Sequence, residues 1–153
     1  MPYCVDTSAW LDGWRRYYPP DVFPSLWEKI DLQICAGSIF SSEEVYVELK
    51  KKDDDLHKWI QARKDRMLVE PNEAIQNRVA SLLATYPRLV DTLKGRSQAD
   101  PFVIATAVEL HAAVVTGEIS GNQDRPRIPF VCQVEGVKCI TFLQMIRELN
   151  LTF

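Results

Sequence analysis

Two short apolar runs that each end at an acidic residue place the strongest constraint on how this chain folds. The first, Tyr3–Val5, leads directly into Asp6, and the second, residues 111–116, leads into Glu118 two residues later. Apolar runs of this length, bounded by polar turn residues, are typical of buried strands. Helical patterns lie between them, and strands that alternate with helices form parallel sheets. We therefore predict a single α/β domain over residues 1–153, with a parallel central sheet flanked by helices on both faces.

The composition is that of an ordinary globular protein. Apolar residues make up 46% of the 153 residues and charged residues 25%, which suffices for a sizeable core. The chain has a net charge of −3, so it is not basic overall, as nucleic-acid-binding proteins typically are. Its local basic clusters are still compatible with binding to a nucleic acid. The sequence has no signal-peptide pattern and no apolar run of about 18 residues, so we expect a cytoplasmic protein without membrane association. The four cysteines include no CxxC pair, which argues against a structural zinc site.

The first part of the chain is expected to hold two helices separated by a stretch rich in proline and aromatic residues. Residues 9–17 resemble a short helix, which a pair of prolines would end. Asp21 is placed to cap a second helix that continues to Leu32. We expect the aromatic side chains of residues 17–27 to pack in the core or in a lid. A platform for stacking nucleobases is the alternative interpretation.

The remaining elements follow from periodicity and capping patterns. Residues 36–40 are expected to be a short connection. Ser41 would then cap a helix in which Glu44 stands three residues later, the pattern of a capping box. Asp100 is placed to cap a very apolar helix, with Pro101 at its first position. The other expected elements are a helix from residue 53, a strand at 67–69, a helix at 73–86, a loop at 95–98, a strand at 137–140 and a helix at 142–149.

Four acidic residues stand out by their positions. Asp6 and Glu118 follow the two strand-like runs, Asp100 opens the apolar helix, and Glu48 lies in a partly apolar helix. Each has an ordinary explanation as a helix cap or a solvated side chain, but the carboxyl ends of parallel strands meet at one edge of a sheet. Carboxylates brought close together repel unless a cation neutralises them or one of them is protonated. Oxygen ligands without histidine or cysteine suit Mg²⁺ or Mn²⁺, so the sequence predicts a cation site at this edge.

These acids lie in segments that resemble a PIN domain, the nuclease fold of VapC-type toxins from bacterial toxin–antitoxin pairs. The resemblance covers nearly the whole chain in order and spacing. The proline- and aromatic-rich block of residues 14–27 resembles a poorly characterised subgroup of PIN-like proteins. The matching segments are Val5-Asp6-Thr7-Ser8, Val45-Tyr46-Val47-Glu48-Leu49, residues 99–107 and Val114-Val115-Thr116-Gly117-Glu118.

The resemblance implies a metal-dependent endoribonuclease that cleaves RNA phosphodiesters, as the toxin of a type II toxin–antitoxin pair. It implies that Asp6, Asp100 and Glu118 hold Mg²⁺ or Mn²⁺. Glu48 would complete the catalytic site, either directly or through water. Members of the family commonly dimerise and pair with a cognate antitoxin, so a homodimer and an antitoxin partner are expected.

Two hydroxyl groups and one departure from the family pattern complete the expected site. The resemblance implies that Ser8 and Thr116 orient a carboxylate or a water molecule. Glu118 stands where aspartate is common in the family, so its role could pass to Asp124 in the following loop. Glu44, one helical turn before Glu48, is a further substitute.

Three basic residues are candidates for contacts with RNA. Arg15, Arg16 and Lys51 belong to short basic clusters, and such clusters more commonly form solvated faces than binding sites.

Two other functions compete with the nuclease interpretation. A PIN-like fold could bind RNA or a protein without catalysis, although the chain retains all four acidic positions. A phosphatase of the haloacid-dehalogenase type also begins with a strand that ends in aspartate. That chemistry needs a second aspartate two residues later, where this chain has Ser8.

Overall fold

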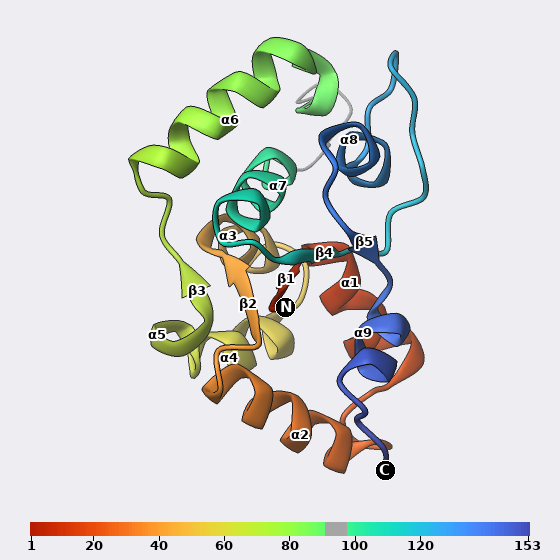
Figure 1. Cartoon of the computed structure of the whole chain (residues 1–153). Helices are drawn as coiled ribbons and strands as arrows, with labels where there is room; N and C mark the ends of the chain where they lie inside the picture. Colours follow the sequence, from red (N-terminus) through yellow and green to blue (C-terminus); the bar gives the residue numbers. More distant parts are fainter. Residues whose placement is uncertain (91–97) are drawn as a thin grey trace.

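A parallel sheet forms the centre of the computed structural model, which describes residues 1–90 and 98–153. Within these residues five strands lie in the order β3-β2-β1-β4-β5, and each adjacent pair is parallel (Figure 1). The central strand β1 pairs through Tyr3 with Ile39 on one side and with Ala113 on the other. The predicted parallel α/β fold is therefore confirmed. The strands are β1 (Tyr3–Val5), β2 (Ile39–Ser42), β3 (Leu68–Val69), β4 (Ala113–Val115) and β5 (Cys139–Ile140).

Helices cover both faces of this sheet, as expected (Figure 1). On one face α7 contacts β1, β2 and β4, and α6 packs on the outside of α7, with α8 beside them. The other face carries α1, α2, α4 and α9. The helices of the described residues are α1 (Thr7–Leu11), the π-helical η1 (Asp12–Tyr17), α2 (Pro24–Cys35), α3 (Glu43–Leu49), α4 (Asp54–Gln61), α5 (Lys64–Met67), α6 (Glu73–Thr85), the 3-10 helix η2 (Pro87–Leu89), α7 (Asp100–Glu109), α8 (Ile128–Glu135) and α9 (Phe142–Glu148).

The strand order reverses between β1 and β4. Strands β1, β2 and β3 follow one another outward to one edge, whereas β4 and β5 extend the sheet from β1 in the opposite direction. In open α/β sheets such a reversal leaves a crevice at the carboxyl ends of the two strands, where ligands bind. The residues that follow β1 and β4 therefore border this crevice.

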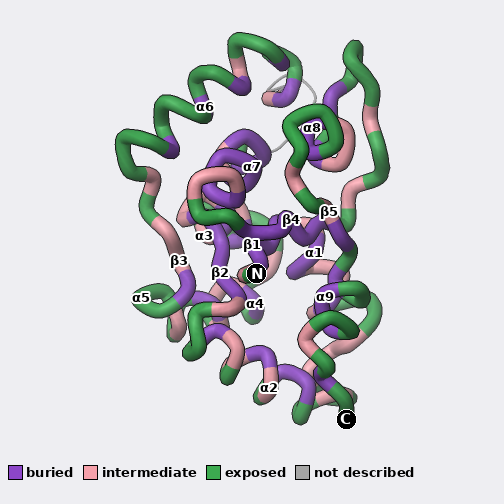
Figure 2. Tube along the Cα trace, in the orientation of Figure 1, coloured by how far each residue is buried: buried purple, intermediate pink, exposed green. Residues whose placement is uncertain are grey.

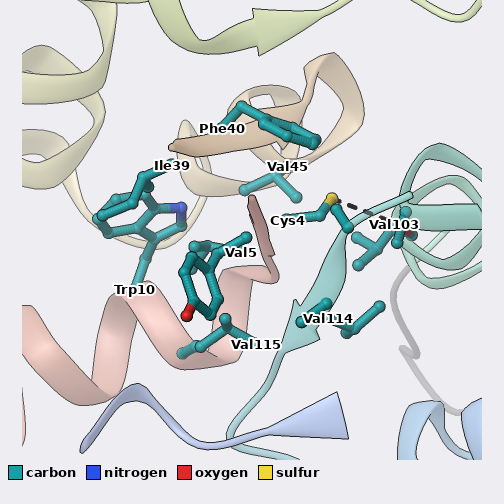
Figure 3. Close-up of a cluster of buried hydrophobic side chains, with 14 of the residues drawn as sticks. Cys4, Val5, Trp10, Ile39, Phe40, Val45, Val103, Val114 and Val115 are labelled. Carbon is teal, nitrogen blue, oxygen red and sulfur yellow. Dashed lines mark hydrogen bonds between the residues drawn. The ribbon is translucent and has the colours of Figure 1, made fainter. Parts of the chain in front are cut away.

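The core runs through the sheet and α7. Every residue of β1 and β4 is buried, and Figure 2 shows the buried trace concentrated in the strands and in α7. The Cys4 thiol lies inside this core and donates to the carbonyl oxygen of Val103 at 3.6 Å (Figure 3). Cys4 is therefore a small core residue, as its apolar surroundings in the sequence indicate. No helix of the described residues is long and apolar enough to cross a membrane.

All four tryptophans of the chain meet in one aromatic cluster beneath the sheet. The Trp10 ring centroid lies 6.2 Å from that of Trp27 and 6.0 Å from that of Trp59, and Trp14 lies 4.9 Å from Trp27. Trp10 is fully buried and Trp27 is 4% exposed. Rings covered to this extent cannot stack on a nucleobase. Among the aromatic residues 17–27, core packing is therefore the correct interpretation for Trp27, and the stacking platform is wrong for it.

The expected connection at residues 36–40 is wrong, because the chain forms strand β2 from Ile39 to Ser42. The strand was hard to recognise in the sequence because it ends in two serines, whereas buried strands are usually apolar. Ser41 is buried but satisfied: its hydroxyl donates to the Val5 carbonyl oxygen at 2.7 Å and accepts from Trp10 Nε1 at 2.9 Å. The helix cap is accordingly Ser42, which accepts from the backbone N–H of Glu44, and not Ser41.

Two other expected caps are wrong. Helix α2 begins at Pro24, with Phe23 at the capping position, so Asp21 lies outside the helix. Proline suits the first position of a helix because it lacks an N–H there. Helix α7 is preceded by Ala99, and Asp100 is its first residue rather than its cap. The expected loop at 95–98 lies outside the described residues except for its last position.

Candidate metal centre

Three carboxylates converge at the crevice between β1 and β4 in the described part of the chain. One oxygen each from Asp6, Asp100 and Glu118 lies within 4.8 Å of the others. Asp6 follows β1 directly, and Glu118 lies three residues beyond β4. Asp100 comes from the first turn of α7, which packs against both strands. The parallel pairing of β1 with β4 and the packing of α7 on both strands therefore bring together three of the four acids singled out in the sequence.

The Asp6 carboxylate is held by two hydroxyl groups. Although Asp6 occupies the capping position of α1, its side chain makes no capping hydrogen bond. Its Oδ2 atom instead accepts from Ser8 Oγ at 2.6 Å and from Thr116 Oγ1 at 3.0 Å. Both hydroxyls expected near the site thus contact this carboxylate, and helix capping does not explain Asp6.

Backbone contacts fix Glu118 at the other side of the cluster. Its Oε2 atom accepts from the N–H of Ile128, the first residue of α8, at 3.0 Å, and its own N–H donates to Thr116 Oγ1 at 3.1 Å. The longer side chain of glutamate therefore reaches the cluster while one of its oxygens accepts from the first N–H of α8. Asp124 is exposed in the preceding loop, where its N–H donates to Asn122 Oδ1, and the structure does not bring it to the carboxylates.

Asp100 carries a buried acceptor that has no partner. The residue is 4% exposed, and its Oδ1 atom has no hydrogen-bond partner among the described residues. A buried polar atom left unsatisfied costs about 1–3 kcal/mol. A cation would remove that cost, because carboxylate oxygens bind hard divalent ions directly.

Burial and mutual repulsion disfavour the ionised forms of the two buried acids. Burial, followed by the charges of Asp6 and Glu118, raises the pKa of Asp100 to about 10. Burial, followed by the charge of Glu118, raises the pKa of Asp6 to about 7, while its hydrogen bonds to Ser8 and Thr116 act in the opposite direction. Deprotonated together, these carboxylates need a positive charge between them, and all the donors are oxygens. The cluster could therefore hold a divalent cation of the hard type.

Glu48 lies close to the cluster but outside it. After the larger effects of burial and of the other acids, its charge also raises the pKa of Asp6 and of Asp100. Its Oε1 atom lies 3.3 Å from Lys52 Nζ, one turn further along the chain. In this structure Glu48 is thus a neighbour of the three carboxylates and is paired with an ammonium group.

The basic residues predicted to contact RNA have different surroundings. Arg15 is held by Asp53, whose Oδ2 atom accepts from its Nε atom at 2.6 Å. Arg16 is exposed and lies 3.8 Å from an oxygen of Asp12, and Lys51 is exposed on the turn after α3. None of the three is part of the carboxylate cluster.

Two residues beside the site were missed by sequence reasoning. The Asp12 carboxylate packs against Gly117 so closely that a Cβ atom there would overlap it. Lys52 pairs with Glu48. The available signal was helical spacing: Asp12 stands four residues after Ser8, and Lys52 four residues after Glu48, so each shares a helix face with a predicted site residue.

Comparison with solved structures identifies proteins with a similar fold. A chain of VapBC-1 from nontypeable Haemophilus influenzae matches with a TM-score of 0.60 and 16% sequence identity, over 94% of this chain and 99% of that chain. A chain of VapBC2 from Rickettsia felis, in a structure bound to a DNA fragment from their promoter, matches with a TM-score of 0.57 and 15% identity. That match covers 92% of this chain and 98% of the other. At these identities the likeness establishes a shared fold.

Comparison of the sequence itself places the chain in a family. A search of curated proteins found no match. A family model described as "Domain of unknown function (DUF4411)" matches residues 3–153, which include all of the carboxylates described above. The chain therefore belongs to the DUF4411 family.

Proposed function

We propose that this chain is a PIN-type endoribonuclease that cleaves RNA phosphodiesters with Mg²⁺ or Mn²⁺. The observation that carries the proposal is the convergence of Asp6, Asp100 and Glu118, with a buried oxygen of Asp100 left unpartnered. These three residues would hold the cation, and Glu48 would complete the site. The bound cation would supply charge stabilisation of the transition state and would acidify a water molecule to make it a nucleophile.

The residues around the cluster prepare it for this chemistry. Ser8 and Thr116 hold one oxygen of Asp6 and so direct the carboxylate towards the cluster. The N–H of Ile128 fixes one oxygen of Glu118. Asp6 and Asp100 are buried, whereas Glu118 is only partly buried, so an RNA phosphate would approach on the Glu118 side. Ligands held rigidly in this way need little rearrangement when the cation and the substrate bind.

A direct assay tests the proposal. The purified protein is incubated with mixed RNA in Mg²⁺, in Mn²⁺ or in EDTA, and cleavage is expected only with the metals. Asp6→Asn and Asp100→Asn should each lower the rate by at least about 100-fold, because each removes a charge that holds the cation. Asp21→Asn is the matched control, since this aspartate is exposed and is not one of the clustered acids. Cleavage that continues unchanged in Asp6→Asn or Asp100→Asn would contradict the proposed site.

The same assay separates the competing functions. Release of phosphate from small phosphoesters without RNA cleavage would favour the phosphatase. Binding of RNA or protein without hydrolysis would favour the interaction module. Rates for Glu118→Gln and Asp124→Asn also decide which of these two acids serves as the ligand, and we expect a loss only for Glu118→Gln.

We further propose that the chain is the toxin of a type II pair, and that it forms a homodimer and binds a cognate antitoxin. Support comes from the shared fold with VapBC chains and from the PIN-like segments of the sequence. Co-expression with the product of the neighbouring reading frame should relieve growth inhibition and yield a co-purifying complex. Light scattering of the isolated chain measures its oligomeric state.

A further inference from the structure

A polar cleft lies between η1 and the turn that joins α3 to α4. Its volume is about 490 Å³. Four cationic side chains and three aspartates line it: Arg15, Lys50, Lys51, Lys52, Asp53, Asp54 and Asp55. The balance of these charges depends on which of them already have partners.

One aspartate of the cleft is paired, and the other two lie at the start of a helix. Asp53 caps α4, with its Oδ1 atom accepting from the N–H of Leu56 at 3.0 Å, and its Oδ2 atom pairs with Arg15. Asp54 and Asp55 lie in the first turn of α4, where the partial positive charge of the helix end stabilises acids. In contrast, Lys50 and Lys51 form no ion pair within residues 1–90 and 98–153. The cleft therefore presents ammonium groups without partners.

Arg15 gives the cleft a fixed shape. Its Nε atom donates to Asp53 Oδ2, and its Nη2 atom donates to the carbonyl oxygen of Lys52. These bonds tie η1 to the α3–α4 turn across 37 residues of sequence. Two nitrogen atoms of the guanidinium thus bond within the protein, so Arg15 holds the turn that carries the lysines.

Lys52 joins the cleft to the metal centre. Its Nζ atom lies 3.3 Å from Glu48 Oε1, and the Lys52 side chain is still 47% exposed. Helix α3, which carries Glu48, packs against α1 and α7, the helices adjoining Asp6 and Asp100 (Figure 1). The ammonium group of Lys52 therefore stands where the acidic site ends and the cleft begins.

We propose that this cleft binds the RNA backbone phosphate next to the scissile one, with Lys52 as the residue that contacts it. Lys50 and Lys51, which line the same cleft, contact further phosphates of the RNA backbone. The proposal rests on the proposed ribonuclease function and names how the substrate is held there. Lysine binds phosphate as a point charge without reading bases, so this contact would position RNA of any sequence.

The salt dependence of RNA binding tests the proposal. Affinity of the whole protein for a labelled single-stranded RNA is measured in EDTA, which prevents cleavage, over a range of salt concentrations. Each lost phosphate contact lowers the slope of log affinity against log salt by about 0.7 for single strands. Lys52→Gln should lower the slope by this amount and should weaken the affinity for RNA several-fold. Lys52→Arg should retain the slope, because it keeps the charge. The matched control is Lys58→Gln, which changes an exposed lysine of α4 outside the cleft and should leave the slope unchanged.

The outcomes separate this inference from the proposed function. If the wild-type chain neither binds RNA in EDTA nor cleaves it in Mg²⁺ or Mn²⁺, both proposals fail. If the wild-type chain cleaves RNA but Lys52→Gln has the slope of Lys58→Gln, only the phosphate cleft is overturned. A melting temperature equal to that of the wild-type chain verifies that Lys52→Gln is folded.

Discussion

The protonation of the two buried aspartates couples the stability of the metal-free protein to pH. Burial and neighbouring carboxylates raise the pKa of Asp6 to about 7 and that of Asp100 to about 10. An unfolded chain releases these protons near pH 4. Between that pH and the folded pKa values the unfolded state binds fewer protons than the folded state. The free energy of unfolding must therefore fall as the pH rises.

The first prediction concerns this pH dependence. In EDTA, the wild-type chain should lose more stability between pH 5 and pH 8 than Asp100→Asn, because asparagine stays neutral and also relieves the repulsion on Asp6. Urea unfolding at several pH values measures the slopes. Asp124→Asn changes an exposed aspartate away from the cluster and should retain the wild-type slope. Equal slopes for the wild-type chain and Asp100→Asn would contradict the electrostatic account of the cluster.

At the scale of elements, the close approach of η1 to the segment after β4 fixes the position of Glu118. The Asp12 carboxylate packs against Gly117, and a Cβ atom on Gly117 would also lie 3.3 Å from the carbonyl oxygen of Ser8. The Gly117 N–H donates to Ser8 Oγ at 2.9 Å, so the same segment is tied to the hydroxyl that holds Asp6. Any side chain at residue 117 must therefore displace either Asp12 or the segment that carries the ligand.

The second prediction follows from that contact. Gly117→Ala should turn the Asp12 side chain away from its preferred rotamer, at a cost of about 0.5–1.5 kcal/mol, and any shift of the segment that carries Glu118 should weaken Mn²⁺ binding. Asp12→Ala removes the overlapping carboxylate, so the double variant should recover much of the loss. Chemical unfolding and calorimetric titration of Mn²⁺ supply the double-mutant cycle. Strictly additive effects would show that the two residues do not interact.

Elements differ in how far the sequence alone predicts them. Strands β1 and β4 and helix α6 follow from apolar runs and helical periodicity, and the structure has them where they were expected. Strand β2 could not be recognised, because the partners that satisfy Ser41 are Trp10 and the Val5 carbonyl oxygen, more than thirty residues away. The residues of the candidate site also differ in how far the sequence predicts them.

The three clustered acids were predictable because Asp6 and Glu118 follow strands and Asp100 begins a helix. The contacts that support these acids could not be predicted from the sequence. The hydrogen bond from Ile128 to Glu118, the packing of Asp12 on Gly117 and the hold of Arg15 on the α3–α4 turn all join segments that meet only in the folded chain.

At the scale of the whole molecule, the carboxylate cluster joins three segments that are far apart in sequence. Asp6 follows the central strand, Asp100 begins the buried helix α7, and Glu118 lies between β4 and α8. Without a cation, burial and mutual repulsion disfavour the ionised forms of Asp6 and Asp100, so these acids retain protons in the folded chain. A bound divalent ion would reverse the effect and join the two halves of the sheet to α7.

The third prediction is that Mn²⁺ stabilises the entire fold. A ligand that binds only the folded state adds about 2.7 kcal/mol at a concentration one hundred times its Kd. The gain should be larger at pH 8 than at pH 5, because at pH 5 protons compete for Asp6 and Asp100. Asp100→Asn should show little gain at either pH, and the unfolding midpoint measured with and without Mn²⁺ makes the comparison. Equal stabilisation of the wild-type chain and Asp100→Asn would mean that Mn²⁺ binds elsewhere, and the cluster would then be a buried acidic group without a cation.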